Sequence, residues 1–407
     1  MTMIPLEYLE KVDRALLRAA AECDAPLPVD AAAKAEIRRR VLEILRIDPA
    51  WRPAIAADTV GVREFDSFRV EELVFESWPG FRGRASLYLP SGVEKPPVVL
   101  FNHGHAMTSG RRSAAYQCMG QALASHGVAM LVADVTGCGE REATGHKRCF
   151  KVFGSGTTIG GIIVLEAMGF ARFLRECGRF DTSRIGIAGQ SGGGQTTLFL
   201  SALIPDEAAL FAPSGFIHSF EFNARKGRRF CDCSIFPGVV GEVEMYHLLG
   251  CVAPKPLLIA SGGGDPMIAR DVVINTGHRL KRIWQEYGAE ENFEQLRWKG
   301  GHSLATSPES LYGVANFILK HFGLPTVPDG TPLPEPLLPT EVVPAELGAG
   351  ELDIEQLAEK LTGKISPERH SLAEAFPPRL VPADAELEDD WRELLAQLES
   401  FVSTRRL

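Results

Sequence analysis

The chain has 407 residues, of which 45% are hydrophobic, and a formal net charge of −9. That length and apolar content can bury a large core, but no run of ~18 apolar residues predicts a membrane span, and no basic stripe predicts a nucleic-acid surface. Eight cysteines are too few for a disulfide scaffold, so we expect free thiols in a reducing compartment.

The N-terminal part, residues 1–60, is predicted to be a helical segment packed on the main body. Residues 6–20 and 29–45 alternate apolar and charged side chains at helical spacing, and Pro26 and Pro28 separate the two runs. The first residues carry acids and lack an apolar core, which argues against a secretory signal. We therefore expect a cytoplasmic protein.

A mainly parallel α/β domain is predicted over residues 61–323. Period-two patterns on both sides of Trp78-Pro79-Gly80 predict antiparallel strands within 62–89 at the edge of the sheet. Short apolar runs then alternate with helical patterns, which predicts a parallel sheet with helices on both faces. The expected strands are 97–102, 128–133, 185–188, 207–212, 257–260 and 293–298, and the expected helices are 113–126, 157–177, 195–202, 271–288 and 309–322.

Two segments, about 140–156 and 213–256, interrupt this alternation. Segments above the strand ends wall the pocket in such folds, so we expect them to select the substrate. The second is rich in aromatic residues, and we expect Phe216, Phe220 and Phe236 in the pocket wall.

The C-terminal extension, residues 324–407, differs from the body in composition. It holds 11 of the 27 prolines and 17 acidic against 7 basic residues. Amphipathic helices are predicted at 352–361 and 386–402, and their apolar faces need a partner surface. That surface is either the body or another subunit, which makes the extension a candidate contact in a homo-oligomer.

The most informative stretch is residues 184–194, RIGIAGQSGGG. A strand that turns into a helix through G-x-S-x-G is a nucleophile elbow, which lifts the hydroxyl of Ser191 above the sheet at the start of the helix. The alternative is a glycine-rich turn whose serine only caps a helix.

An elbow predicts an acid and then a histidine after later strands. Asp265 follows the strand 257–260 and a glycine run; its alternative role is to cap the next helix, and Asp271 is the nearest competitor. His302 lies in a glycine loop after the last strand, whereas His278 and His321 fall on helices. We expect His302 to be the base and Asp265 to orient it.

Two backbone amides are expected to form the oxyanion hole, those of Gly192 and His105. His103 and His105 could instead bind a metal, but alternate residues point in different directions and no third ligand is evident. Cys231 and Cys233 are separated by a single residue, a spacing that does not suit a tetrahedral zinc site. We therefore expect no metal and no other cofactor.

Four stretches together resemble the α/β-hydrolase superfamily across residues 62–323, and within it the bacterial acetyl-xylan-esterase-like and dienelactone-hydrolase-like branches. They are the HGH at 103–105, the DVTGCG at 134–139, the elbow GQSGGGQTTLFLSAL, and the block CDCSIFPG before APKPLLIASGGGD. The resemblance implies an esterase with Ser191 as nucleophile, His302 as base and acid, Asp265 as its orienter, and a structural Asp134. The absence of an export signal and the acidic extension depart from the family pattern.

The sequence thus predicts a serine carboxylic-ester hydrolase that acts through an acyl-enzyme on a small or medium ester. The same triad could instead cleave an amide or a C–C bond, or the fold could bind a ligand without catalysis.

Overall fold

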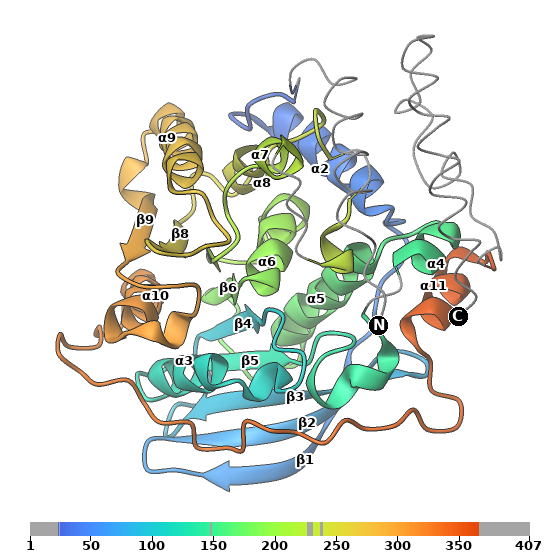
Figure 1. The fold of residues 1–407 in the computed structure, drawn as a ribbon. Coiled ribbons are helices and arrows are strands. Elements are labelled where there is room, and N and C mark those ends of the chain that lie inside the picture. Colours follow the sequence, from blue (N-terminus) through green and yellow to red (C-terminus); the bar gives the residue numbers. More distant parts are fainter. Residues whose placement is uncertain (1–22, 24, 147–148, 226–230, 237–238, 366–407) are drawn as a thin grey trace.

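The computed structural model describes residues 23–365 except 24, 147–148, 226–230 and 237–238 (Figure 1). The predicted helices at 6–20 and 386–402 lie outside the described residues. A nine-stranded mixed sheet forms the centre of the described part. Its strands are β1 (Ala56–Glu64), β2 (Phe68–Trp78), β3 (Phe81–Pro90), β4 (Val98–Asn102), β5 (Ala129–Ala133), β6 (Ile185–Gln190), β7 (Leu210–Ser214), β8 (Leu257–Gly262) and β9 (Phe293–Trp298).

The strand order is β1-β2-β3-β5-β4-β6-β7-β8-β9. The first three strands form an antiparallel meander, and β3 joins antiparallel to β5. From β5 to β9 every neighbouring pair is parallel. The carboxyl ends of β4, β6, β8 and β9 therefore meet at one edge, where the predicted site residues follow them.

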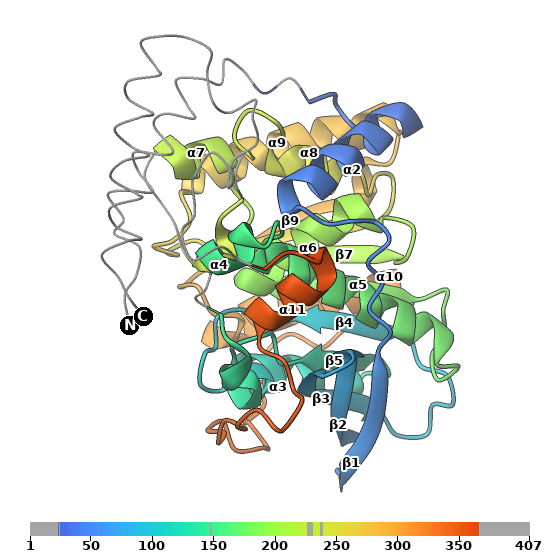
Figure 2. The same cartoon turned by 90° about the vertical axis from the view of Figure 1, so that its right-hand side faces the viewer.

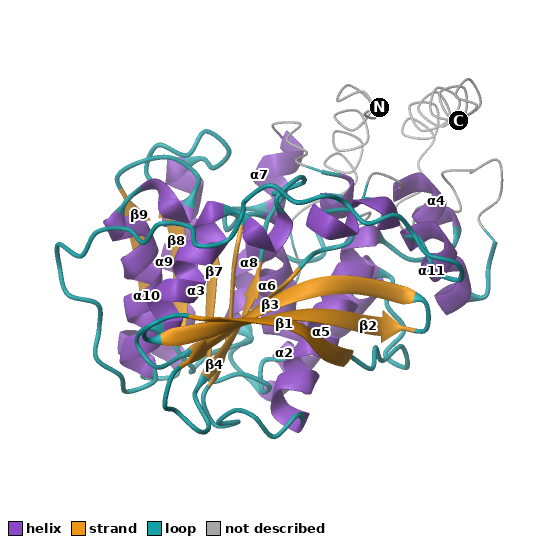
Figure 3. Ribbon diagram, turned by 90° about the horizontal axis from the view of Figure 1, so that it is seen from below, coloured by secondary structure: helices purple, strands orange, loops and turns teal. Residues whose placement is uncertain are grey.

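Helices cover both faces of the sheet, as Figure 3 shows from below. Strand periodicity explains the two layers: Val98 and Leu100 of β4 point into one core, and Val99 and Phe101 into the other. One face packs against α3 (Ala114–Ala124) and α10 (Pro308–His321). The opposite face packs against α5 (Ile159–Glu176), α6 (Gly192–Leu203) and α9 (Arg270–Glu286). In the same core, α2 (Ala31–Leu45) and α8 (Met245–Gly250) pack on α6.

The interrupting segments hold short helices, the first α4 (Cys149–Gly154) and the second α7 (Phe220–Arg225) together with α8. None of the described helices is both long and apolar enough to cross a membrane.

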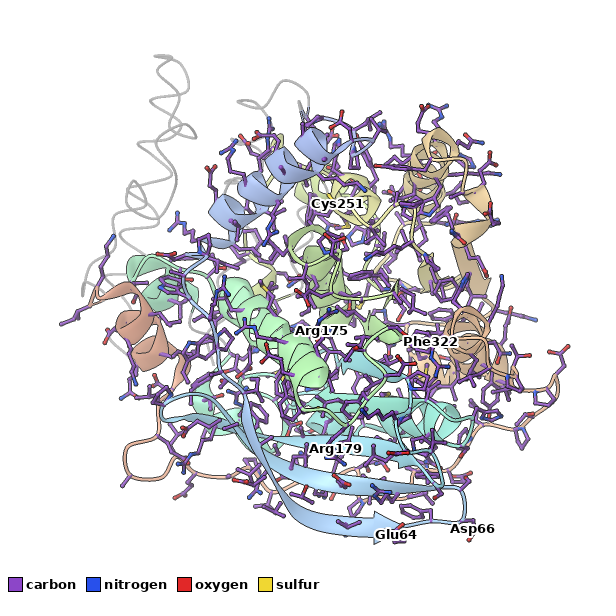
Figure 4. All side chains as sticks on the ribbon, turned by 180° about the vertical axis from the view of Figure 1, so that it is seen from behind. Glu64, Asp66, Arg175, Arg179, Cys251 and Phe322 are labelled. Carbon is purple, nitrogen blue, oxygen red and sulfur yellow. The ribbon has the colours of Figure 1, made fainter. Side chains whose placement is uncertain are left out.

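The start of β7 differs from the prediction, which places it at residue 207. Glu207 lies instead in the preceding turn, where its carboxylate pairs with Arg175 at 3.0 Å. Figure 4 shows Arg175 at the end of α5, on the back of the molecule. Glu207 therefore lies before the strand, which begins at Leu210.

The described part of the C-terminal extension docks on its own chain. It runs along the lower side of the body and ends in α11 (Ile354–Thr362) beside α4 (Figures 1 and 2). The Gln117 side chain exchanges two hydrogen bonds with the backbone of Leu338, at 2.8 and 2.9 Å. Ile354, Leu357 and Ala358 are fully buried. The apolar face of α11 is therefore covered by the body.

Candidate active site

Ser191 lies at the sharp turn between β6, which ends at Gln190, and α6, which begins at Gly192. Its backbone has φ 58° and ψ −120°, a conformation that is strained for a residue with a side chain. The Ser191 amide donates to the carbonyl of Ser214 at 2.8 Å, which ties the turn to the end of β7. Neighbouring strands thus hold the serine in its strained position.

The glycines around Ser191 are required by close backbone approach. A Cβ on Gly104 would lie 2.7 Å from both the Ser191 Cβ and the Gln190 carbonyl oxygen. A Cβ on Gly193 would overlap the carbonyl of Asn102 at the end of β4. Only glycine lets β4, the elbow and α6 come this close.

His302 and Asp265 meet although 37 residues separate them. The His302 Nδ1 and the Asp265 Oδ2 lie 2.6 Å apart, and the Asp265 side chain is fully buried. The other carboxylate oxygen accepts the amide of Met267 at 2.9 Å. With both oxygens bound, the carboxylate is fixed in one orientation toward the imidazole.

Pairing between two glycine loops brings about this meeting. The amides of Gly263 and Gly264 donate to the carbonyls of Trp298 and Gly300, each at 2.8 Å. The loop after β8 and the loop after β9 therefore continue the pairing of their strands. The sequence places both residues after strands, and this pairing sets their distance.

Ser191 and His302 face each other across Gly215. A Cβ on Gly215 would lie 3.4 Å from the Ser191 amide nitrogen and 3.2 Å from the His302 Cε1. The Gln190 side chain donates to the His302 carbonyl at 2.7 Å, which ties the histidine loop to the elbow. Among the described residues, the buried His302 Nε2 has no hydrogen-bond partner, so no bond to the serine hydroxyl is formed. Such bonds often close only when substrate is bound.

The loop after β4 carries the predicted oxyanion donor His105. The Gly104 amide donates to the Tyr116 hydroxyl at 2.8 Å, and the imidazole of His105 packs against Gly192. Within the described part of the chain, the amides of His105 and Gly192 donate to no hydrogen-bond acceptor. Both amides are thus available beside the serine.

His103 and Asp134 are structural. The His103 Nδ1 lies 2.7 Å from the Gly104 carbonyl, and its Nε2 accepts the Val135 amide at 2.9 Å. Burial lowers the pKa of His103 to about 4, which keeps this imidazole neutral. The Asp134 carboxylate is buried and binds the Arg111 guanidinium at 2.6 Å, in agreement with the structural role that the resemblance implies.

A small pocket opens at the serine. Its wall consists of His105, Ser191, Gly192, Gly215, Phe216, Ser234, Met267 and Ile268. Its cavity volume is about 10 Å³, the space of roughly one water molecule. The subsite next to the serine is therefore narrow and partly apolar.

Three phenylalanines are predicted in this wall, and of these only Phe216 lines it. Phe236 and Phe220 pack instead on Phe199 of α6, with ring centroids 4.7 and 6.3 Å away. Neither lines the small pocket at the serine, so the pocket role of these two stays a prediction. Aromatic content alone cannot distinguish a pocket wall from the packing beneath it.

The comparisons with known proteins agree with this architecture. The acetyl xylan esterase family model matches residues 62–225. A methylesterase structure shares 22% identity over 96% of this chain and 76% of its own, with a TM-score of 0.57. The chain has the α/β-hydrolase fold. An acetyl xylan esterase from Bacteroides fragilis, described as putative, follows with 16% identity over 70% and 81% of the two chains and a TM-score of 0.54.

A glucuronoyl esterase of Solibacter usitatus shares the α/β-hydrolase fold as well, with 13% identity, coverage of 75% and 99%, and a TM-score of 0.55. A search of curated proteins finds no match. The family match confirms the predicted resemblance and, at this coarse level, an enzyme of the carboxylic-ester hydrolase class.

Sequence reasoning missed one cluster in this α/β-hydrolase. The side chains of His105, His146, Cys231 and Cys233 converge, with ligand atoms that all lie within 4.8 Å of one another. They come from three separate segments, so no short sequence motif contains all four residues and predicts the cluster. The sequence offers one signal of such a cluster: one interrupting segment contains two cysteines, and the other contains a histidine.

Proposed function

We propose that this chain is a serine esterase in which Ser191 is the nucleophile, His302 the general base and acid, and Asp265 the residue that orients the imidazole. The observation that carries the proposal is the arrangement around Gly215, with a strained serine on one side and an imidazole on the other. The Nδ1 of this imidazole is bound to a buried carboxylate, and its Nε2 has no hydrogen-bond partner in the described part of the chain. An imidazole whose Nδ1 is bound to a carboxylate is fixed in orientation, and its Nε2 can accept the proton of a hydroxyl group.

The reaction would follow two steps. The Ser191 hydroxyl attacks the ester carbonyl and passes its proton to His302 Nε2, while the amides of Gly192 and His105 stabilise the oxyanion. Collapse releases the alcohol, which takes the proton from the imidazolium. Water, activated by the same nitrogen, then hydrolyses the acyl-serine and restores the enzyme.

We further propose that the acyl group is short, an acetyl group in the first place. The pocket at the serine has the volume of roughly one water molecule, and a methyl group is of similar size. A longer acyl chain would need Met267 or Ile268 to move. The match to the acetyl xylan esterase family model supports the same choice.

The test is a panel of p-nitrophenyl esters of increasing acyl length, with acetylated sugars, a methyl ester and p-nitroacetanilide alongside. We expect acetate to have the highest kcat/KM and Ser191→Ala to lose turnover and labelling by a fluorophosphonate. Unchanged turnover in Ser191→Ala would refute the nucleophile. A preference for the anilide or for long acyl chains would overturn the proposed substrate class.

A further inference from the structure

The side chains of His105, His146, Cys231 and Cys233 form a cluster beside the proposed active site, and the proposed esterase mechanism uses none of these four side chains. Its four ligand atoms come within 4.8 Å of one another, and its burial ranges from partial to complete. His105 follows β4, His146 lies within the first interrupting segment, before α4, and the cysteines belong to the second. Three parts of the chain therefore supply the cluster.

His146 is held as metal-binding histidines are held. Its Nδ1 lies 2.7 Å from the Thr136 carbonyl, which fixes the ring and makes this nitrogen the donor. The opposite nitrogen, Nε2, is buried and has no hydrogen-bond partner among the described residues. An imidazole that donates through one nitrogen and offers the other to a cluster of thiols has the second-sphere arrangement of a metal ligand.

The other ligands are also held in place. The His105 Nε2 lies 3.1 Å from the Cys233 sulfur, and the rings of His105 and His146 are nearly perpendicular, at 82°. The Gln195 side chain donates to the Cys233 carbonyl at 3.1 Å, which fastens the cysteine segment to α6. The ligand set thus rests on ordered elements.

We propose that these four residues bind one zinc ion in a closed tetrahedral site. Ligand atoms around zinc lie about 3.3–3.8 Å apart, so a contraction of about 1.5 Å at most converts the observed cluster, whose atoms lie within 4.8 Å of one another, into a site. On binding, each thiol releases one proton to solvent, and the two thiolates balance the charge of Zn²⁺. The site is then formally neutral, and a neutral site is favoured here because an uncompensated charge is costly in a buried environment.

Four protein ligands leave no open position, so the ion is structural and does not bind the ester. It joins both interrupting segments to the loop that carries His105. If the proposed function holds, the ion also fixes the His105 amide at the oxyanion, because its ring and its amide belong to one residue. Metal content tests the zinc site without reference to activity.

The experiment measures zinc by mass spectrometry in the full chain, purified without a histidine tag or chelator and with a reductant. We expect about one zinc ion per chain. Cys233→Ser and His146→Asn should reduce it to roughly a tenth or less, whereas Cys177→Ser, a half-buried thiol away from the cluster, should keep it. Ser191→Ala should keep the zinc and lose activity, which separates the two proposals.

Circular dichroism shows whether each variant folds. If the ligand variants do not fold, the wild-type chain is titrated with a mercurial instead. The mercurial reacts with the cysteine ligands, and the zinc that this reaction releases is measured. Cobalt in place of zinc should give the visible bands of tetrahedral thiolate coordination. A folded protein that holds no zinc even after reconstitution, zinc retained in both ligand variants, or a Cys231–Cys233 disulfide in the reduced preparation would overturn the proposal.

Discussion

Asp265→Asn tests the proposed triad with a change of only one atom. The wild-type carboxylate accepts from His302 Nδ1 at 2.6 Å and is fully buried. An amide in its place can turn its NH₂ group toward Nδ1, which moves the ring proton to Nε2. That nitrogen then cannot take the proton of Ser191, and the imidazolium loses its counter-charge.

The expected loss in kcat is roughly 10³–10⁴-fold, or about 4–5.5 kcal/mol in the activation free energy. Stability should change little, because the amide oxygen can still accept the Met267 amide as Oδ1 does at 2.9 Å. The assay is p-nitrophenyl acetate turnover, with urea unfolding of the same preparation.

The matched control is Asp271→Asn. Asp271 is an exposed acid in the first turn of α9 and was the competing candidate in the sequence. We expect the control to keep wild-type kcat. A folded Asp265→Asn enzyme within tenfold of wild type, or an equal loss in the control, would refute the assignment of the acid.

Three further predictions concern the scaffold around the site. Arg111→Ala leaves the buried Asp134 carboxylate without the guanidinium that it binds at 2.6 Å, and should lower the free energy of unfolding by about 3–5 kcal/mol in urea. Burial lowers the pKa of His247 from 6.5 to about 4, so the unfolded chain binds the proton first as pH falls. Stability is therefore lost below about pH 6.5, and the wild type should lose about 2 kcal/mol more than His247→Gln between pH 7 and 5. Gly104→Ala places a Cβ 2.7 Å from that of Ser191 and should lower kcat/KM roughly 100-fold. Gly61→Ala is the control, because its Cβ meets nothing closer than 3.9 Å and should leave activity unchanged. Equal activity of the two variants would contradict the packing argument.

Local sequence signals predict much of the fold. The strand at 293–298, which reads FEQLRW, is found at those residues: a helical pattern precedes it and a glycine loop follows it, and these two signals mark its ends. β1 begins at Ala56, earlier than the antiparallel pattern predicts. This edge strand is largely exposed, so its sequence lacks the alternation of apolar and polar residues that marks a strand with one buried face.

Features that depend on the meeting of distant segments are harder to predict. The order of Ser191, Asp265 and His302 follows from the elbow, but the hydrogen bond between the last two depends on the pairing of two glycine loops. The cluster around His146 depends on three segments at once. Its cysteines look unsuited to zinc as a pair, and only the folded chain supplies the two imidazoles.

His105 connects the proposed esterase site and the proposed zinc site, one through its backbone amide and the other through its imidazole. Its imidazole reaches Cys233 at 3.1 Å, while its backbone lies beside Gly192 at the elbow. An ion that binds the imidazole limits the rotation of the His105 backbone, so the backbone amide is already oriented toward the oxyanion position before substrate binds. Loss of zinc should then lower kcat with KM nearly unchanged, since the donor acts on charge that develops only in the transition state. An ion that merely stabilises the fold would leave the kcat of the folded fraction intact, so kcat per folded chain in His146→Asn distinguishes a positioning role from a purely stabilising one.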